Sequence, residues 1–208
     1  MIKRYILPLI SILAVANFSF AFGSELDRSY RSFGISFSSV DYSDIGADSK
    51  GIAIVWDYGS YDSNFVSQSV FSYDQIDVAG ATGDLLSTSW LGGYRIQLSD
   101  VLDIVPGVGF NYRNLSSSGW AIADVWSFSY GVMARYSLLE NTTISAGFYG
   151  ESGDLDSWVD EIDGLSVDST AYGVSVEQFF SDAFSMKFAY ATNAFGADGF
   201  SIGFNFLY

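Results

Sequence analysis

The sequence contains no cysteine and no histidine, only two prolines, and 9 basic residues against 24 acidic ones. Without cysteine, the chain can form neither a disulfide nor a thiolate metal site. Without histidine, it lacks the commonest general base and metal ligand. The scarcity of Lys and Arg gives a net charge of -15 and disfavours nucleic-acid binding, which needs a basic patch. We therefore expect no enzyme, no cofactor and no nucleic-acid partner.

The abundant residues are apolar, aromatic and small. Of 208 residues, 49% are hydrophobic, 18% are aromatic and 21 are glycine. A chain of this length suits one domain rather than two. Because Gly, Ser and Asp interrupt every apolar stretch after the N-terminus, no transmembrane helix is expected there. The composition instead favours a β-sheet with one face in lipid.

The N-terminal 21 residues have the features of a secretory signal peptide. Met1 to Arg4 form a short basic stretch, and the apolar run that follows is too short to span a bilayer. Ala21 and Ala16 offer two cleavage sites, and Ala21 is preferred because the mature strands begin shortly after it. The alternative is an uncleaved membrane anchor. We expect a signal peptide at residues 1–21 and one mature domain at residues 22–208.

After this segment, apolar residues alternate with small or polar residues in ten stretches. A period of two predicts β-strands. The third stretch has mixed parity and is the least regular. The expected strands lie at residues 33–37, 52–58, 65–76, 86–98, 104–112, 126–138, 144–148, 172–176, 186–190 and 200–208.

The connections between the expected strands alternate between short and long. Short links at 62–64, 99–100, 140–141 and 181–183 take turns with longer segments rich in Gly, Ser and Asp. This alternation is typical of outer-membrane barrels, which have short periplasmic turns and long extracellular loops. A sheet in lipid must also close on itself, because unpaired backbone groups are costly there. The sequence therefore predicts an all-β fold: a closed antiparallel transmembrane β-barrel of ten strands, with eight as the alternative.

The last ten residues, GFSIGFNFLY, alternate between small or polar and large apolar side chains, apart from Leu207. This segment resembles the closing strand of bacterial outer-membrane β-barrel proteins, in which alternate residues are apolar and the last is aromatic. In that class the assembly machinery reads these positions as a signal. Tyr208 stands where the class usually has Phe. The corresponding positions here are Phe200, Ile202, Phe204, Phe206 and Tyr208.

The resemblance is to the general class of small OmpA-like or porin-like barrels and not to a particular subfamily. It implies export to the outer membrane of a Gram-negative bacterium. It also implies contact with outer-membrane lipids and lipopolysaccharide, and insertion by the barrel-assembly machinery. These partners follow from the class alone.

Aromatic residues toward the strand ends predict girdles at the two membrane interfaces. Pro106 has lipid-facing parity inside the fifth expected strand. Since proline lacks the N–H that the ladder needs, we expect a bulge or a late strand start there. The outer girdle comprises Trp90, Tyr112, Trp126 and Tyr190, and the inner girdle comprises Tyr58, Tyr136 and Tyr208.

The opposite parity, which faces the barrel interior, consists mostly of Gly, Ala and Ser. Four acidic and four basic residues share this parity, with Gln97 and Asn111 as neutral members. Because an isolated ion in a narrow interior is costly, this balance predicts paired charges. Such a network is either a structural plug or a gated ion path. The expected lumen network comprises Asp57, Arg95, Asp103, Arg113, Arg135, Glu151, Glu177 and Lys187.

Most other acidic residues fall in the expected outer loops, where Lys50 is the only basic residue. Such a rim repels anions and holds divalent cations loosely. The segment DLDSWVDEIDG weakly resembles a calcium loop, but Trp158 stands where the third ligand should be, so a solvated acidic loop is expected instead. The weak candidate ligands are Asp154, Asp156, Asp160 and Asp163. The other acids of this rim are Asp41, Asp44, Asp48, Asp74, Asp77, Asp84, Asp124, Glu161, Asp168 and Asp198.

One short motif suggests chemistry that the rest of the chain does not support. Residues 199–203 fit G-x-S-x-G, but a nucleophile elbow needs a strand-to-helix turn and a histidine. We expect a non-enzymatic integral outer-membrane protein that acts through acidic extracellular loops in adhesion, envelope integrity or surface contact. The alternative is a narrow, cation-favouring diffusion pore, since ten strands enclose a far smaller lumen than general porins do.

Overall fold

The computed structural model describes residues 31–42, 46–59, 63–78, 81–117, 120–157, 163–193 and 196–208. The predicted signal peptide, residues 1–21, lies outside these ranges. None of the described segments is a helix with the length and apolar character needed to cross a membrane. Within the described ranges the strands are β1 (Ser32–Tyr42), β2 (Ala47–Gly59), β3 (Phe65–Val78), β4 (Ala81–Tyr94), β5 (Ile96–Ser99), β6 (Leu102–Ser117), β7 (Trp120–Leu139), β8 (Thr142–Ser157), β9 (Ser169–Ser181), β10 (Phe184–Asn193) and β11 (Ala197–Leu207).

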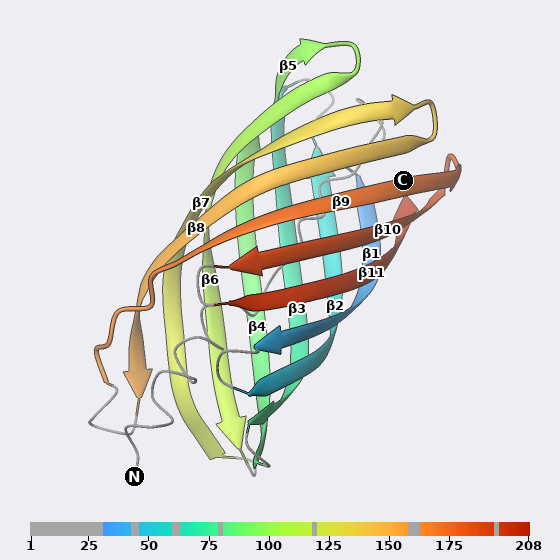
Figure 1. Cartoon of the computed structure of the whole chain (residues 1–208). Helices are drawn as coiled ribbons and strands as arrows, with labels where there is room; N and C mark the ends of the chain where they lie inside the picture. Colours follow the sequence, from blue (N-terminus) through green and yellow to red (C-terminus); the bar gives the residue numbers. More distant parts are fainter. Residues whose placement is uncertain are drawn as a thin grey trace.

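The strands close into one antiparallel barrel (Figure 1). Neighbouring strands follow the order β4-β3-β2-β1-β11-β10-β9-β8-β7-β6-β5, and β4 also pairs with β6. The first and last strands close the wall, pairing from Ser32 opposite Leu207 to Tyr42 opposite Ala197. Since β4 and β5 pair in succession with the same strand, β6, they are two parts of one wall strand. The wall therefore has ten strands, which confirms the predicted barrel, and the alternative of eight is wrong.

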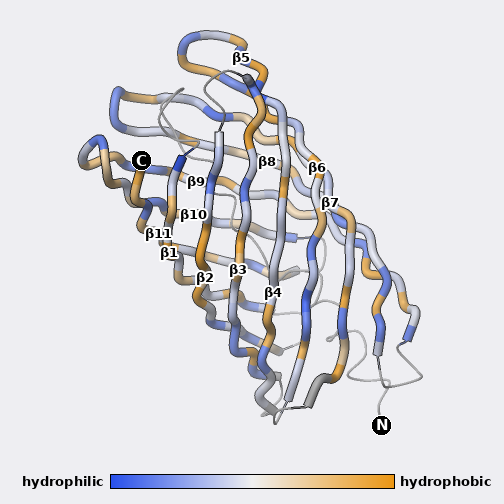
Figure 2. The backbone as a smooth tube through the Cα atoms, turned by 180° about the vertical axis from the view of Figure 1, so that it is seen from behind, coloured by the Kyte–Doolittle hydropathy of each residue, from blue (hydrophilic) through white to orange (hydrophobic). Residues whose placement is uncertain are grey.

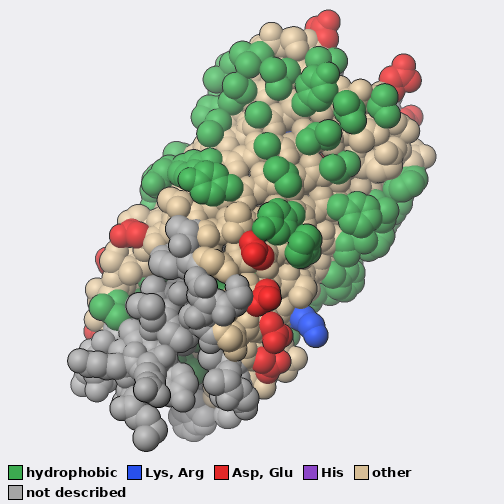
Figure 3. Space-filling view, in the orientation of Figure 1, with side chains coloured by type: hydrophobic (Ala, Val, Ile, Leu, Met, Phe, Trp, Pro, Cys, Tyr) green, Lys and Arg blue, Asp and Glu red, His purple; other side chains and the backbone are tan. Residues whose placement is uncertain are grey.

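Alternation of side chains gives the wall its two faces. Along β2, buried and exposed residues alternate almost without exception, and Figure 2 shows the matching alternation of hydropathy along the strands. The exposed positions carry large apolar side chains, such as Trp126 and Phe200, each 64% exposed. Figure 3 shows apolar side chains spread over the middle of the visible surface, with acidic side chains toward its ends. The outward face therefore matches a lipid-facing band.

The two ends of the barrel differ in their connections. One end, called the short-turn end from here on, carries the tight links at 100–101, 140–141 and 182–183, and the C-terminus lies there (Figure 1). The opposite, outer end carries the link at 158–168 between β8 and β9. The other outer connections are shorter than predicted, because the strands extend through residues expected to be loop. Asp77, Asp84 and Asp124 consequently lie in strands.

The wall is interrupted at Arg95, between β4 and β5 and opposite the part of β6 that contains Pro106. β6 runs through Pro106 and keeps its register with β7 there. The predicted bulge or late start at Pro106 is therefore wrong. Because proline offers no N–H, the neighbouring strand breaks instead: β4 ends at Tyr94, and the N–H of Arg95 donates to the carbonyl of Asn64 (2.8 Å).

Candidate functional site

The predicted lumen charges lie on the inward face of the barrel. All except Arg95 are buried, from 0% exposure at Asp103 to 6% at Lys187, and the Arg95 side chain is 12% exposed. Arg113 and Glu151 lie in the outer halves of their strands. The other six lie toward the short-turn end of the barrel, five near the ends of their strands and Arg95 between β4 and β5. They are called the inner charge cluster: Asp57, Arg95, Asp103, Arg135, Glu177 and Lys187.

Opposite charges in the inner charge cluster face each other across the sheet ladder. Lys187 lies directly opposite Glu177, and Arg135 lies directly opposite Asp103. Directly opposed residues on one face have Cβ atoms about 4.5–5.5 Å apart. Arg95 Nε also donates to Asp103 Oδ2 (3.0 Å). Three acids and three bases therefore share this end of the lumen.

The inner charge cluster connects strands that are not neighbours. Lys187 on β10 interacts electrostatically with Glu177 on β9 and with Asp57 on β2. The Asp57 carboxylate accepts hydrogen bonds from the Ser32 hydroxyl (2.8 Å) and from the Gln68 amide (2.7 Å). Buried charges need partners and hydrogen bonds to offset their desolvation. These contacts supply both, so the inner charge cluster can stay charged inside the barrel.

The second group centres on Arg113. Its guanidinium donates to both carboxylate oxygens of Glu151, with an Nη2–Oε2 distance of 2.7 Å. The Ser127 hydroxyl donates to the same carboxylate, and the Asn111 amide donates to the Tyr149 hydroxyl (2.7 Å) and to Ser127 (3.3 Å). A bidentate pair fixes geometry as well as charge. It spans from β6 to β8, over β7.

The lumen is also filled by large apolar side chains, which sequence reasoning missed. Leu85 is 0% exposed, and Met133 packs with Val66 and Val105. The predicted lining of mostly Gly, Ala and Ser is therefore wrong for much of the interior. Other buried apolar residues of strands with inward parity include Val55, Val70, Ile76, Leu115, Val125 and Leu155.

Two polar residues occupy positions other than those predicted. Asp74, expected in an outer loop, is 6% exposed on β3 and accepts hydrogen bonds from Ser38 (3.3 Å) and Ser72 (3.2 Å). Its carboxylate fills the space beside Gly51, where an added Cβ would lie 1.8 Å from Asp74 Oδ1. Gln97, expected in the lumen network, lies exposed on β5. Asn111, the other neutral residue predicted for the lumen network, is buried.

Exposed carboxylates face one another at the outer end. Asp41 lies opposite both Asp48 and Asp198, and Asp48 lies opposite Asp77, so the row crosses β11, β1, β2 and β3. Like charges directly opposite are destabilising. Nearby, hydrogen bonds from Ser152 and Ser166 lower the pKa of the exposed Asp168 carboxyl below its ordinary value. This end of the barrel therefore carries a dense negative charge.

The weak calcium candidates do not converge in the described part of the chain. Asp154 and Asp156 are exposed on β8, and the Asp163 carboxylate accepts from the Ser157 backbone N–H (3.1 Å). Asp160 lies outside the described residues. Within the described ranges, no group of three or more acidic side chains is arranged to hold a metal ion.

The aromatic residues predicted for the two girdles lie at different positions along the barrel axis. The Tyr112 and Trp126 rings contact each other at a tilted angle in the outer half (4.7 Å between centroids). The Tyr112 and Tyr190 hydroxyls donate to Asp124 (2.9 Å) and Asp198 (2.7 Å). Tyr73, which sequence reasoning missed, makes the same bond to Asp84 (2.6 Å). Tyr58 and Tyr136 lie exposed toward the short-turn end.

Trp90 does not belong to the outer girdle. Its register partner is Phe110, in the middle of β6, and their rings are 5.4 Å apart. The Trp90 ring leans over Gly92, where an added Cβ would lie 2.6 Å from it. Trp90 therefore packs within the apolar band.

The C-terminal residues form β11, with Phe200 and Phe206 exposed and Ile202 and Phe204 half-buried on the outward face. The terminal Tyr208 hydroxyl accepts a hydrogen bond from Trp56 Nε1 on β2 (2.6 Å).

On the inward face of β11, the Asn205 amide donates to Glu177 (3.1 Å). Ser201, the centre of the G-x-S-x-G match, lies inside a regular ladder between β1 and β10. It is therefore not on a strand-to-helix turn.

No protein-family model and no curated protein matches the sequence. Solved structures do match the fold. An outer membrane channel from Pseudomonas putida F1 has a TM-score of 0.57 at 10% identity, covering 93% of this chain and 100% of that one. The β domain of the Bordetella autotransporter BrkA has a TM-score of 0.50 at 10% identity, covering 85% and 98%. The translocator domain of the autotransporter NalP from Neisseria meningitidis has a TM-score of 0.50 at 10% identity, covering 85% and 87%.

These similarities, at identities this low, concern the fold. The first of the three is described as an outer membrane channel, and the other two as the β domain and the translocator domain of autotransporters. Together with the closed ten-stranded wall and its apolar outward face, they assign the chain the fold of outer-membrane β-barrel proteins.

Proposed function

We propose that this protein is a non-enzymatic integral outer-membrane barrel whose lumen is closed by packed side chains. It acts from its surface, in envelope integrity, adhesion or environmental contact. The observation that carries the proposal is the burial of the inward face: Arg113 and Glu151 are 1% and 2% exposed, and Leu85 is fully buried. The side chains that line a water-filled pore are exposed to water, whereas those inside a plugged barrel are buried.

The membrane location is supported by the outward face. Large apolar side chains cover it, and tyrosines lie toward both ends of the strands, as interfacial aromatic residues do. Export through a cleaved signal peptide at residues 1–21 belongs to the same proposal. So do contact with outer-membrane lipids and lipopolysaccharide, and insertion by the barrel-assembly machinery.

The purified protein is expected to behave as a detergent-dependent barrel. Without heating it should migrate on a gel as a compact band, and after boiling as a slower one, because a closed sheet resists unfolding by detergent alone. Circular dichroism in detergent should show strand and almost no helix. A monomer that stays soluble and folded without detergent would contradict the membrane assignment.

We further propose that divalent cations bind loosely at the outer end, where the carboxylate row lies. Removing them with a chelator should lower the unfolding temperature by roughly 2–4 °C for each kcal/mol lost, because the opposed acids then repel. Asp41→Asn should weaken this dependence, and Asp100→Asn, in a turn at the other end, should not. Identical chelator responses in both variants would contradict the proposal.

A narrow, cation-favouring pore is the second candidate. It is favoured by the fold similarity to a protein described as an outer membrane channel, and by the acidic outer end, which concentrates cations locally. The two candidates make opposite predictions for electrical recording of the unmodified protein in a planar bilayer. The closed barrel is silent, and the pore conducts cations steadily.

A further inference from the structure

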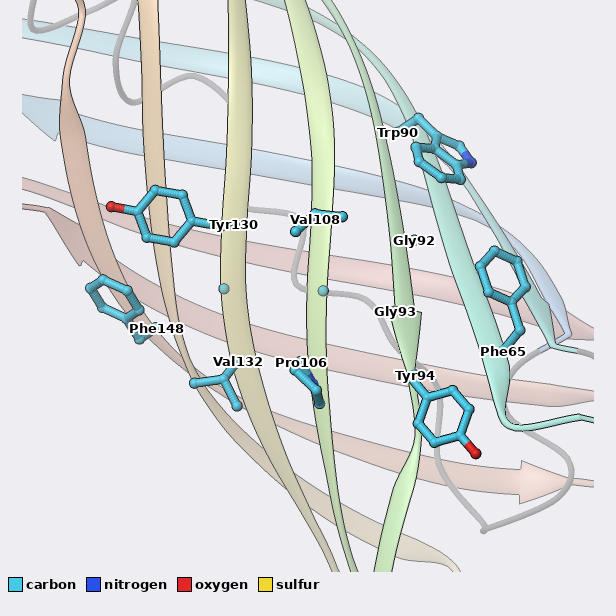
Figure 4. Close-up of a pocket in the computed structure, with 12 residues that line it drawn as sticks. Phe65, Trp90, Gly92, Gly93, Tyr94, Pro106, Val108, Tyr130, Val132 and Phe148 are labelled. Carbon is cyan, nitrogen blue, oxygen red and sulfur yellow. The ribbon is translucent and has the colours of Figure 1, made fainter.

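The outward face of the barrel contains an apolar groove toward the short-turn end. It has a volume of about 600 Å³ and is open along its outward side. Figure 4 shows Trp90, Phe65 and Tyr94 on one side of the groove and Tyr130 and Phe148 on the other. None of the described residues that line it is charged. The groove is therefore suited to an apolar guest.

The floor of the groove is backbone. Gly92 takes an outward position in β4, between Ser67 on β3 and Val108 on β6. It supplies no side chain there, and the Trp90 ring leans over it. The backbone of Gly107 and Gly131, which are directly opposed on β6 and β7, continues the floor. The groove is thus a depression in an otherwise bulky outward surface.

One end of the groove lies at the short-turn ends of β3 and β4. Phe65 is the first residue of β3, and its register partner Tyr94 is the last residue of β4. The Tyr94 hydroxyl accepts a hydrogen bond from the Asn64 amide (3.3 Å). Exposed tyrosines of this kind sit at the membrane–water interface. From there the groove leads past Gly92 toward Trp90 and the apolar middle of the wall.

We propose that this groove holds one acyl chain of a phospholipid from the leaflet at the short-turn end. This rests on the proposed membrane location. The groove is continuous with the lipid-facing band, begins beside Tyr94 at the short-turn ends of β3 and β4 and has no charged lining residue, so a single methylene chain fits it. A lipid A anchor is disfavoured, because its phosphates need basic partners and no described lining residue is basic.

The test compares lipid retention in barrels purified from membranes of cells that produce the full chain. Native mass spectrometry in mild detergent counts the phospholipids that remain bound. Val108→Trp fills the groove from a site that is already 51% exposed, and Gly92→Leu fills its floor. Ile54→Trp is the matched control, because Ile54 is 44% exposed on β2, outside the groove. Gel mobility with and without boiling reports folding of each variant independently.

The wild type and Ile54→Trp should retain one phospholipid through detergent washing. In the groove variants its occupancy should fall about tenfold, as a loss of roughly 1.4 kcal/mol produces. If one groove variant fails to fold, the other decides. Equal retention in all folded proteins, no retained lipid in the wild type, retained lipid A instead, or a dimer lost in Val108→Trp would each overturn the proposal. Failure of the wild type to behave as a detergent-dependent barrel would instead overturn the membrane assignment.

Discussion

Replacing Arg113 by Ala should destabilise the barrel by about 3–5 kcal/mol, the usual cost of removing one partner from a buried ion pair. Both carboxylate oxygens of Glu151 lose their guanidinium donors, and the carboxylate remains buried with Ser127. A buried acid without its cation draws in water or a proton. The same substitution also removes a large side chain from the lumen. We therefore expect a less stable and leakier barrel.

Two measurements check this expectation. The temperature of the gel-mobility transition should fall in Arg113→Ala, and planar-bilayer recording should show silence in the wild type and current in the variant. Lys50→Ala removes a basic residue at an exposed position and should change neither. The double variant Arg113→Met with Glu151→Leu should recover stability, since apolar residues of similar volume can replace a buried pair. Steady cation-selective current in the wild type would instead support the pore.

Replacing both Phe206 and Tyr208 by Ser or Asp should prevent insertion and leave the protein to periplasmic proteases. Phe206 is 56% exposed and Tyr208 61% exposed, at the short-turn end of the closing strand. Polar or charged groups at these positions oppose insertion into lipid, and they remove the aromatic end that the assembly machinery is proposed to read. The expected result is near absence of the protein from the outer membrane.

Fractionation and immunoblotting measure this outcome, with conservative variants as controls. Tyr208→Phe restores the usual terminal residue and should insert normally. It removes the acceptor for Trp56 Nε1, so it should lower the heat-modification temperature slightly, as Trp56→Phe should. Normal membrane levels of the double Ser or Asp variant would show that the C-terminus carries no assembly signal.

The outward face could be predicted from the sequence because its rule is simple. Lipid demands apolar side chains at every second residue, so sets such as Ile52, Ile54 and Trp56 are visible without any three-dimensional information. The strand count and the inward parity of the charged residues follow from the same alternation. Inward pairing partners do not, because register decides them. Arg135 and Asp103 are 32 positions apart in the chain and meet only through the β6–β7 ladder.

The errors arise where both faces of a strand carry apolar side chains. In β3, Phe71 and Tyr73 face outward while Val70 and Ile76 pack inward. Alternation therefore vanishes, which explains the mixed parity of residues 65–76 and the missed apolar lumen.

The misplacement of Asp74 has a related cause. An acidic residue near the end of an expected strand is normally predicted to lie in a loop. The burial of Asp74 depends on the hydroxyls of Ser38 and Ser72 and on the space beside Gly51. Ser72 is two residues away on the same strand, but Ser38 comes from β1 and Gly51 from β2, and the sequence alone does not show that these strands meet beside Asp74.

The pairing of β1 with β11 has a kinetic consequence. Ser32 cannot meet Leu207, 175 positions further along, until β11 has been made, so the barrel closes through a very long-range contact. Until then the sheet has two free edges whose backbone groups can pair with other chains, and sheets with such non-local pairing form slowly. The period before β11 pairs with β1 is thus the interval in which this sheet is most exposed to aggregation, and in which a chaperone or assembly factor would protect it most.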